Sequence, residues 1–186
     1  LILFLPVNES TSGMVFASTL IGAGLAVGLG CFGSGVGCGF PAAQACSGVA
    51  RNPKKSTALT STMMIGQALA QSPSIFATIV ALILLFLPTP SVGIASAGIA
   101  IAAGLSMGAS ALGPGLGSGI TAGGAVKGQS DWPQSRSITV RTMMIGQAIC
   151  DTPAIFGMLV SFIMLFTLQD LEVSIIGFSK VMAAAI

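Results

Sequence analysis

The sequence has no histidine, no tyrosine and very little charge. Only 6% of its 186 residues are Asp, Glu, Lys or Arg, whereas a soluble domain carries about a quarter. The absence of histidine excludes an imidazole metal site or an imidazole proton shuttle. The formal net charge of +2 is too small to indicate a nucleic-acid partner. With 53% hydrophobic residues and a mean hydropathy of +0.96, the chain is predicted to be a membrane protein.

Cysteine is also scarce, and its placement excludes two further kinds of site. The four cysteines lie within apolar runs, and no two have the CxxC spacing of a metal site. They are predicted to be small packing residues, at Cys31, Cys38, Cys46 and Cys150. No nucleophile, metal cluster or phosphate-binding loop is recognisable, so an independent enzyme is not predicted. Residues 1–6 are apolar but short and lack a basic start, so a signal peptide is not predicted either.

Four long apolar runs dominate what is present. They cover residues 14–46, 56–87, 93–127 and 138–168. Each exceeds the ~20 residues that a membrane-spanning helix needs. Proline, glycine and polar residues predict breaks between them at residues 51–55, 87–91 and 128–136.

The second half of the chain repeats the first. Residues 62–68 read Thr-Met-Met-Ile-Gly-Gln-Ala and recur 80 positions later, as residues 142–148. The same shift superimposes a row of glycines, Gly33, Gly35, Gly37 and Gly39, on Gly113, Gly115, Gly117 and Gly119. The sequence therefore predicts an all-α membrane protein with four transmembrane helices, arranged as two tandem helical hairpins. The first hairpin is residues 14–87, after an N-terminal segment 1–13, and the second is residues 93–168.

Basic residues predict the orientation, and the tail is left with two interpretations. Lys and Arg gather in the loop of each hairpin, whereas the central link 87–93 has no charge. Both charged loops are therefore expected in the cytoplasm, with the termini and the central link on the other side. Residues 169–186 are either a short interfacial helix or the polar end of the fourth span.

Asp151 is the only acidic residue inside any of the four apolar runs. A charged carboxylate at the centre of a bilayer costs about 3 kcal/mol on insertion scales. A membrane protein tolerates this only if the group is protonated, paired or ligated, and such residues mark ion pathways. Asp151 is therefore the candidate functional residue.

The glycine-rich first helix of each hairpin predicts very close helix packing. Glycine allows two backbones in a membrane to approach each other, as in small-xxx-small interfaces. A dense stripe of glycines implies a partner on every flank. This pattern favours an oligomeric ring of hairpins over a lone four-helix bundle.

Together these features resemble the proteolipid, or c-ring component, of rotary ATP synthases. The resemblance rests on the Gly-rich helix, the Arg51-Asn52-Pro53 loop, and Ile-Gly-Gln-Ala followed by a carboxylate and Ile-Phe. It covers both hairpins and is similar to the duplicated proteolipids of vacuolar-type and sodium-type enzymes. It implies a non-catalytic rotor-ring subunit that carries an ion between two half-channels of a stator, with no cofactor besides that ion.

The resemblance also implies the partners of the chain. These are other ring subunits, in a homomeric or mixed ring, and the stator a subunit with its arginine. The central stalk is expected to contact the cytoplasmic loops through Arg51, Asn52 and Pro53, and membrane lipid surrounds the ring. The expected location is a bacterial inner membrane.

Asp151 is the ion carrier that the resemblance implies. Gln71 stands at the same place in the first hairpin, and an amide has no proton to lose, so that hairpin is a degenerate site. Ser118 stands where the family places the partner of the acid, and Cys38 is its counterpart in the degenerate site. Gln147 lies one turn before Asp151 on the same helix face.

Further ion ligands are expected from hydroxyl and carbonyl oxygens. Thr152 follows the acid directly, and sodium-type relatives imply Leu69 and Ser72 as ligands from the adjacent helix. Proline frees a carbonyl four residues earlier, so Pro73 and Pro153 either create ligands or only bend their helices. Sodium-type sites usually have Gln at the position of Ser118 and Tyr at that of Phe156. H+ is therefore preferred, with Na+ at Asp151 as the alternative.

Two other functions remain open at this point. A small multidrug or ion transporter also uses duplicated helices around an intramembrane acid. A structural membrane proteolipid would use Asp151 as a packing residue. Carbodiimide labelling of Asp151 and the size of the detergent particle distinguish these from a rotor subunit.

Overall fold

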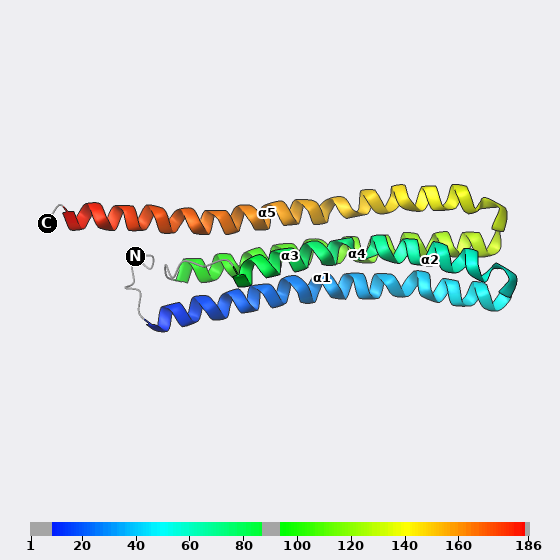
Figure 1. Ribbon diagram of the computed structural model, residues 1–186, viewed down its shortest axis with the longest axis horizontal. Coiled ribbons are helices and arrows are strands. Elements are labelled where there is room, and N and C mark those ends of the chain that lie inside the picture. The colour runs from blue at the N-terminus through cyan, green and yellow to red at the C-terminus, as the bar shows by residue number, and fades with distance from the viewer. Residues whose placement is uncertain (1–8, 87–93, 185–186) are drawn as a thin grey trace.

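Long helices packed side by side make up the whole described chain (Figure 1). The computed structural model describes residues 9–86 and 94–184, and side chains within 13–86 and 96–167. The elements are α1 (Glu9–Arg51), η2 (Pro53–Lys55), α2 (Ser56–Ala70), α3 (Ser72–Phe86), α4 (Ile94–Asp131), η3 (Pro133–Ser135) and α5 (Arg136–Ala184). α1 and α4 are the glycine-rich helices and pack most extensively on each other, while α2–α3 and α5 pack against them.

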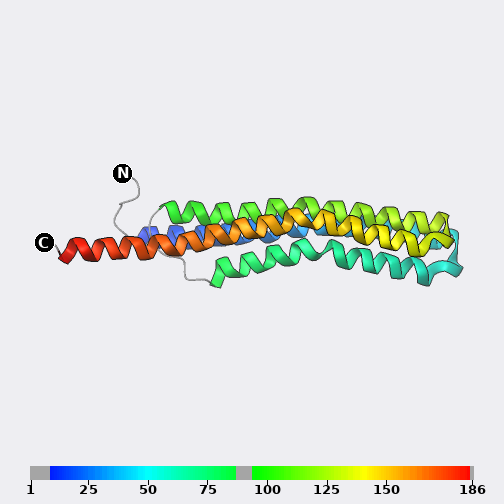
Figure 2. The ribbon, with the colours of Figure 1, turned by 90° about the horizontal axis from the view of Figure 1, so that it is seen from above.

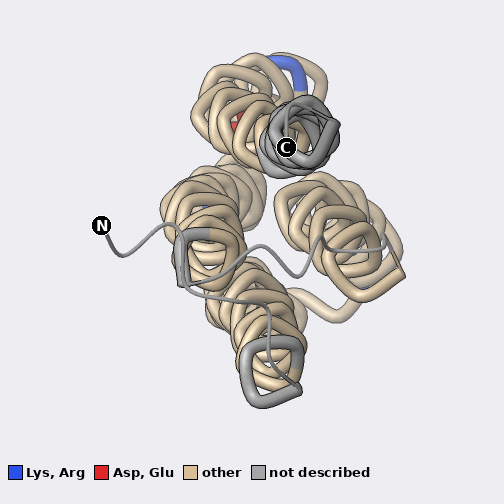
Figure 3. Tube along the Cα trace, turned by 90° about the vertical axis from the view of Figure 1, so that its left-hand side faces the viewer, with Lys and Arg blue, Asp and Glu red and all other residues tan. Residues whose placement is uncertain are grey.

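The predicted four spans are confirmed. Four segments are long and apolar enough to cross a membrane: Gly13–Arg51, Pro53–Phe86, Ser96–Asp131 and Pro133–Thr167. Viewed along the helices, Lys, Arg, Asp and Glu are few and other residues predominate (Figure 3). Large apolar side chains such as Ile149 and Ile163 are 69% and 65% exposed, as expected of a surface that meets lipid or a neighbouring subunit.

Both hairpin loops have the same backbone structure. Asn52 and Trp132 each precede a proline, and their backbones are extended, with φ/ψ of −147°/81° and −127°/82°. A residue before proline avoids the helical region, so each long helix ends there, and a single 3-10 turn follows. Figure 1 shows the two loops at one end of the bundle, and the start of α1 and the end of α5 at the other.

Two predicted boundaries need correction, and the structure chooses between the two interpretations of the tail. Residues 128–131 were expected in a break, but α4 continues to Asp131 because the helix stop is Pro133 rather than Gly128. α1 begins at Glu9, inside the predicted segment 1–13. Residues 169–184 continue α5 without interruption, so the tail extends the fourth span instead of forming a separate helix. The predicted link 87–93 and residues 1–8 lie outside the described residues.

The equivalent prolines of the two outer helices lie in different backbone structures. Pro73 follows a break, because α2 ends at Ala70 and α3 begins at Ser72, and the bend is visible in Figure 2. The Gln71 carbonyl at this break accepts hydrogen bonds from the amides of Ser74 (3.1 Å) and Ile75 (3.3 Å). Pro153 instead lies inside the continuous helix α5. The first hairpin is therefore the more distorted of the two at the level of the acid.

Glycines bring α1 and α4 into backbone contact. A Cβ at Gly33 would come 2.5 Å from the Leu112 carbonyl oxygen, and one at Gly115 would come 2.6 Å from the Ser34 amide. Neither position has room for a larger residue unless the helices separate. This close packing confirms the prediction made from the glycine stripe.

A compensating exchange of small residues distinguishes the two hairpins. In the first, Gly30 packs on Ala77; at the equivalent places in the second, Ser110 packs on Gly157. A Cβ at Gly157 would collide with the Ser110 hydroxyl. Each hairpin thus has room for one side chain at this crossing.

We therefore expect Gly157→Ala to destabilise the second hairpin by roughly 1–3 kcal/mol through overpacking. The double variant Ser110→Gly/Gly157→Ala reproduces the Gly–Ala pair of the first hairpin and should recover most of the loss. Thermal unfolding of the detergent-solubilised chain measures both. Additive losses in the double variant would contradict the exchange.

Candidate functional site

The candidate site lies on α5, at the level where the outer helix of the first hairpin is broken. Asp151 is half-buried, and its Oδ1 atom is fully buried without a hydrogen-bond partner among the described residues. No three or more His, Cys, Asp or Glu residues come together in the described chain. Within the described chain, the candidate site therefore consists of one carboxylate with polar neighbours.

Gln147 connects three helices one turn before Asp151. Its side chain is 1% exposed, and its amide nitrogen donates to the carbonyls of Gly66 in α2 and Ser118 in α4, both at 3.0 Å. The two bonds use both N–H groups, which fixes the amide orientation. Its Oε1 atom is left buried and, within the described chain, unpartnered. Two such oxygens, from Gln147 and Asp151, thus lie on consecutive turns of one helix face.

The hydroxyl groups predicted as ligands bond to their own helices. Ser118 is fully buried, but its hydroxyl donates to the Pro114 carbonyl at 2.6 Å, while its own carbonyl accepts from Gln147. Thr152 is exposed and donates to the Ala148 carbonyl at 3.4 Å. The structure thus brings Ser118 to Gln147, whereas neither hydroxyl is hydrogen-bonded to Asp151, whose Oδ1 atom has no partner among the described residues.

The first hairpin contributes its residues from the break between α2 and α3. Leu69 ends the turn that follows Gly66, and Ser72 begins α3; both are half-buried. Since Gln147 bonds to Gly66, and α2 and α5 both run away from the loops, Leu69 and Ser72 lie close to the level of Asp151. Gln71 is exposed at the break itself.

The degenerate site repeats one contact of the second hairpin. Gln67, the counterpart of Gln147, donates to the Cys38 carbonyl at 3.0 Å, as Gln147 does to Ser118. The Cys38 thiol donates to the Gln67 carbonyl at 3.7 Å. Cys38 and Gln67 are thus joined by two hydrogen bonds, one in each direction.

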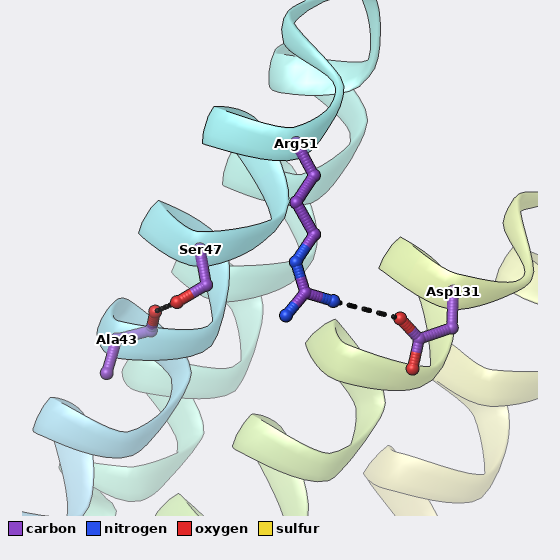
Figure 4. A network of polar contacts seen from close by, with 4 residues as sticks. All are labelled: Ala43, Ser47, Arg51 and Asp131. Atoms are coloured by element: carbon purple, nitrogen blue, oxygen red, sulfur yellow. Dashed lines mark hydrogen bonds and ion pairs between the residues drawn. The ribbon is translucent and has the colours of Figure 1, made fainter.

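At the loop end, residues from the two hairpins form an ion pair. The Arg51 Nη1 atom lies 3.7 Å from the Asp131 Oδ1 atom, and Ser47 donates to the Ala43 carbonyl one turn earlier (Figure 4). Arg51 and Asp131 stand at equivalent positions of the repeat, so the two loops differ in charge. Both side chains are well exposed, and such a pair is worth about 1 kcal/mol or less.

Sequence reasoning missed two buried contacts between the hairpins. The Gly66 carbonyl binds Gln147, and Thr62 donates to Gln129 Oε1 at 2.6 Å in a buried bond. The duplicated Ile-Gly-Gln motif drew attention to Gln147. Its acceptor is a backbone carbonyl, which every residue has, so the sequence does not identify it. The Thr62–Gln129 bond has no counterpart in the repeat, because Val49 stands where the shift places Gln129.

Two repeated hairpins whose helices are long and apolar enough to cross a membrane, with Asp151 as the single acid of their apolar runs, define a duplicated ion-carrying membrane proteolipid. The pattern of the ATP synthase C-subunit family matches residues 21–84 and again residues 101–164. The matches are 80 positions apart, which is the shift of the repeat. The chain belongs to the ATP synthase C-subunit family, as a tandem duplicate of it.

Individual relatives match one hairpin at a time. The ATP synthase c-subunit of Petrotoga mobilis is 42% identical over 74 residues, covering 40% of this chain and 77% of the relative. The chloroplastic c-subunit of Ostreococcus tauri is 38% identical over 73 residues, covering 39% and 89%. The c-subunit of Desulfosudis oleivorans is 41% identical over 78 residues, covering 42% and 81%.

Membership of this family identifies the chain as a rotor subunit. It is an integral membrane protein of the rotor ring (c-ring) of an ATP synthase, with an ion-translocating rather than a catalytic role. The comparisons support this function over a multidrug transporter or a structural proteolipid.

Proposed function

We propose that Asp151 is the single ion carrier of this chain, and that it carries H+ between two half-channels of the stator. The observation that carries the proposal is its buried Oδ1 in the middle of α5, which has no partner in the described chain. Desolvation makes such an oxygen costly unless it binds a proton or a cation. The first hairpin has an amide, Gln71, at the equivalent position and contributes no second carrier.

The two hairpins of one chain form this site together. Gln147 ties α5 to the α2 backbone through the 3.0 Å bond to Gly66, which holds Asp151 beside the first hairpin. Leu69 and Ser72 are the groups of that hairpin closest in level to the acid, so they are its proposed neighbours. The carrier and its environment thus come from a single polypeptide.

Two features favour H+ over Na+. Ser118 is shorter than the glutamine of sodium-type sites and directs its hydroxyl to Pro114. Phe156 is 62% exposed and has no hydroxyl to secure a bound cation. Na+ requires several oxygen ligands, whereas a proton needs only the carboxylate and one acceptor. The Gln147 Oε1 atom is an available acceptor. No cofactor is proposed besides the transported ion.

The proposed partners follow the family. An arginine of the stator a subunit would pair with ionised Asp151 during transfer. The central stalk would contact the loop of Arg51, Asn52 and Pro53, which places both loops in the cytoplasm. The proposed location is a bacterial inner membrane. The basic residues Lys54 and Lys55 at the loop end agree with loops that lie in the cytoplasm.

Carbodiimide labelling of the purified ring tests the proposal. Carbodiimides react with protonated carboxyl groups, so a proton carrier should label at Asp151 with a rate that depends on pH alone. Peptide mapping by mass spectrometry identifies the labelled residue and its stoichiometry, expected to be one per chain. Protection by Na+ at constant pH would assign the site to sodium instead. If Asp151 is labelled at no pH, it is not the carrier.

A further inference from the structure

Two buried oxygen atoms without a partner lie one helical turn apart on α5. They are Oε1 of Gln147 and Oδ1 of Asp151, and in the part of the chain whose side chains the structure describes no other buried side-chain nitrogen or oxygen lacks a partner. Residues four apart lie on one helix face, with about 5–6 Å between their Cβ atoms. A helical side chain leans towards the N-terminal end of its helix, so Asp151 leans towards the turn that holds Gln147. We therefore expect the two oxygens to face the same buried space.

The hydrogen bonds of Gln147 fix which way its amide oxygen points. The amide nitrogen donates to the carbonyls of Gly66 and Ser118, both at 3.0 Å. Turning the amide over would place its oxygen against these two carbonyl oxygens, with no proton between them. The amide is therefore held with its nitrogen towards the two carbonyls. Its oxygen can only accept a hydrogen bond, so a partner of this oxygen has to bring a proton or a cation.

The helices that pack against α5 offer no charge at this level. α2 and α3 contain no Asp, Glu, Lys or Arg, and the charged residues of α4, Lys127 and Asp131, lie near the loops. On α5 itself the nearest basic residue is Arg141, ten residues and about 15 Å before the acid. The thiol of the preceding residue, Cys150, lies against α4 at Gly117. Within the described chain, an ionised carboxylate here would meet another acceptor and no cation, whereas a protonated one can donate.

We propose that Gln147 is the positioning residue of the proton carrier, and that its Oε1 atom accepts a hydrogen bond from the protonated carboxyl group of Asp151. The Gly66 carbonyl holds the amide in the orientation that this bond requires. The first hairpin, which has no acid of its own, thus acts in the site through a backbone group. The inference rests on the proposed role of Asp151 as the H+ carrier and adds the group that holds the protonated acid in place.

Infrared difference spectroscopy of the purified ring tests this hydrogen bond. The C=O stretching band of protonated Asp151 is identified by its absence from the Asp151→Asn ring. In Gln147→Leu the band should move to higher frequency, because the carboxyl group has lost its partner. The protonated form also loses one hydrogen bond. On the alkaline side of the pH profile, carbodiimide labelling of Asp151 should therefore slow roughly three- to tenfold.

Thr62→Val is the control for a purely structural effect. It also removes a buried hydrogen bond between the hairpins, the 2.6 Å bond to Gln129, but about two turns nearer the loops than the acid. It should lower the thermal stability of the ring and leave the Asp151 band and labelling profile unchanged. A band that stays in place in Gln147→Leu, or that moves equally in both variants, would overturn the proposal. Asp151 would still be labelled in that case, so the carrier assignment is tested separately.

A measurement on the wild-type ring keeps the test decisive if Gln147→Leu fails to assemble. Leucine leaves the Gly66 and Ser118 carbonyls without their donor, and buried groups of this kind are costly to leave unpaired. In a ring labelled with ¹³C-glutamine, raising the pH should remove the Asp151 carboxyl band and shift one glutamine amide C=O band at the same time. A pH-difference spectrum without a glutamine band would refute the bond. Loss of the carboxyl band on adding Na+ at constant pH would show that a cation, and not a proton, joins the two oxygens.

Discussion

Asp151→Asn should reduce ATP-driven ion uptake by vesicles containing the reconstituted complex to the background level. An amide of the same shape has no proton to release at physiological pH, so no ion can be handed to either half-channel. The ring itself should still assemble, because Asp151 takes no part in the interhelical hydrogen bonds that Gln147 donates to Gly66 and Ser118. Carbodiimide labelling should disappear in parallel, and ring assembly can be followed on a mild-detergent gel.

Asp131→Asn is the matched control for this variant. It makes the same chemical change at the exposed loop end, where the ion pair with Arg51 contributes about 1 kcal/mol or less. Its ion uptake should remain close to that of the wild type. Ion uptake that survives in Asp151→Asn would show that the carrier is another group.

Gly37→Ala should separate the two hairpins of the isolated chain. A Cβ at this position would collide with the Gly115 carbonyl oxygen. This oxygen belongs to the backbone of α4, so it cannot move aside by a change of rotamer. Overpacking of this kind costs on the order of 3 kcal/mol, a large part of the stability of a membrane domain. The thermal midpoint of the detergent-solubilised chain should fall, and a fluorophore pair on α1 and α4 should report increased separation.

Gly39→Ala provides the comparison on the other flank of the same helix. No atom lies within 4 Å of a Cβ there, so the isolated chain should unfold at the wild-type temperature. Its counterpart Gly119 packs directly on Gly37, so the ring should nevertheless fail to close if copies meet through this row. Equal destabilisation of both isolated variants would contradict the assignment of the two flanks.

Periodicity and repetition made the architecture predictable, whereas the local contacts of the site were not. The shift of 80 residues indicated two hairpins, and the isolated acid indicated Asp151, because both are properties of side chains along the chain. The helical residues 128–131 were mistaken for a break, since Gly128 resembles a helix stop when the packing of its neighbours is unknown. Gln129 is buried against Thr62 there, and this contact supports the helix up to the proline.

The polar contacts of the site depend on orientation, which sequence spacing does not specify. Ser118 aligns with the partner of the acid, yet its hydroxyl satisfies the Pro114 carbonyl of its own helix. Gln147 was recognised as a neighbour of Asp151, but its two acceptors are backbone groups of other helices. Two prolines at equivalent positions also behave differently, because α2 and α3 are separate helices whereas α5 continues through Pro153.

The amide at Gln71 has a mechanical consequence. It stands exposed where the second hairpin has its carboxylate. In a ring made of this chain alone, with Asp151 as the sole carrier, every other hairpin would therefore pass the stator without an ion. Each ion then advances the rotor by the arc of two hairpins, and a full turn moves half as many ions as the circumference could hold. Since one charge crossing 100 mV exchanges about 2.3 kcal/mol, halving the ions per turn halves the electrical work per turn. Such a rotor moves few ions per ATP. The hydrolysis of one ATP can therefore maintain a steeper ion gradient, whereas the synthesis of one ATP requires a steeper ion gradient.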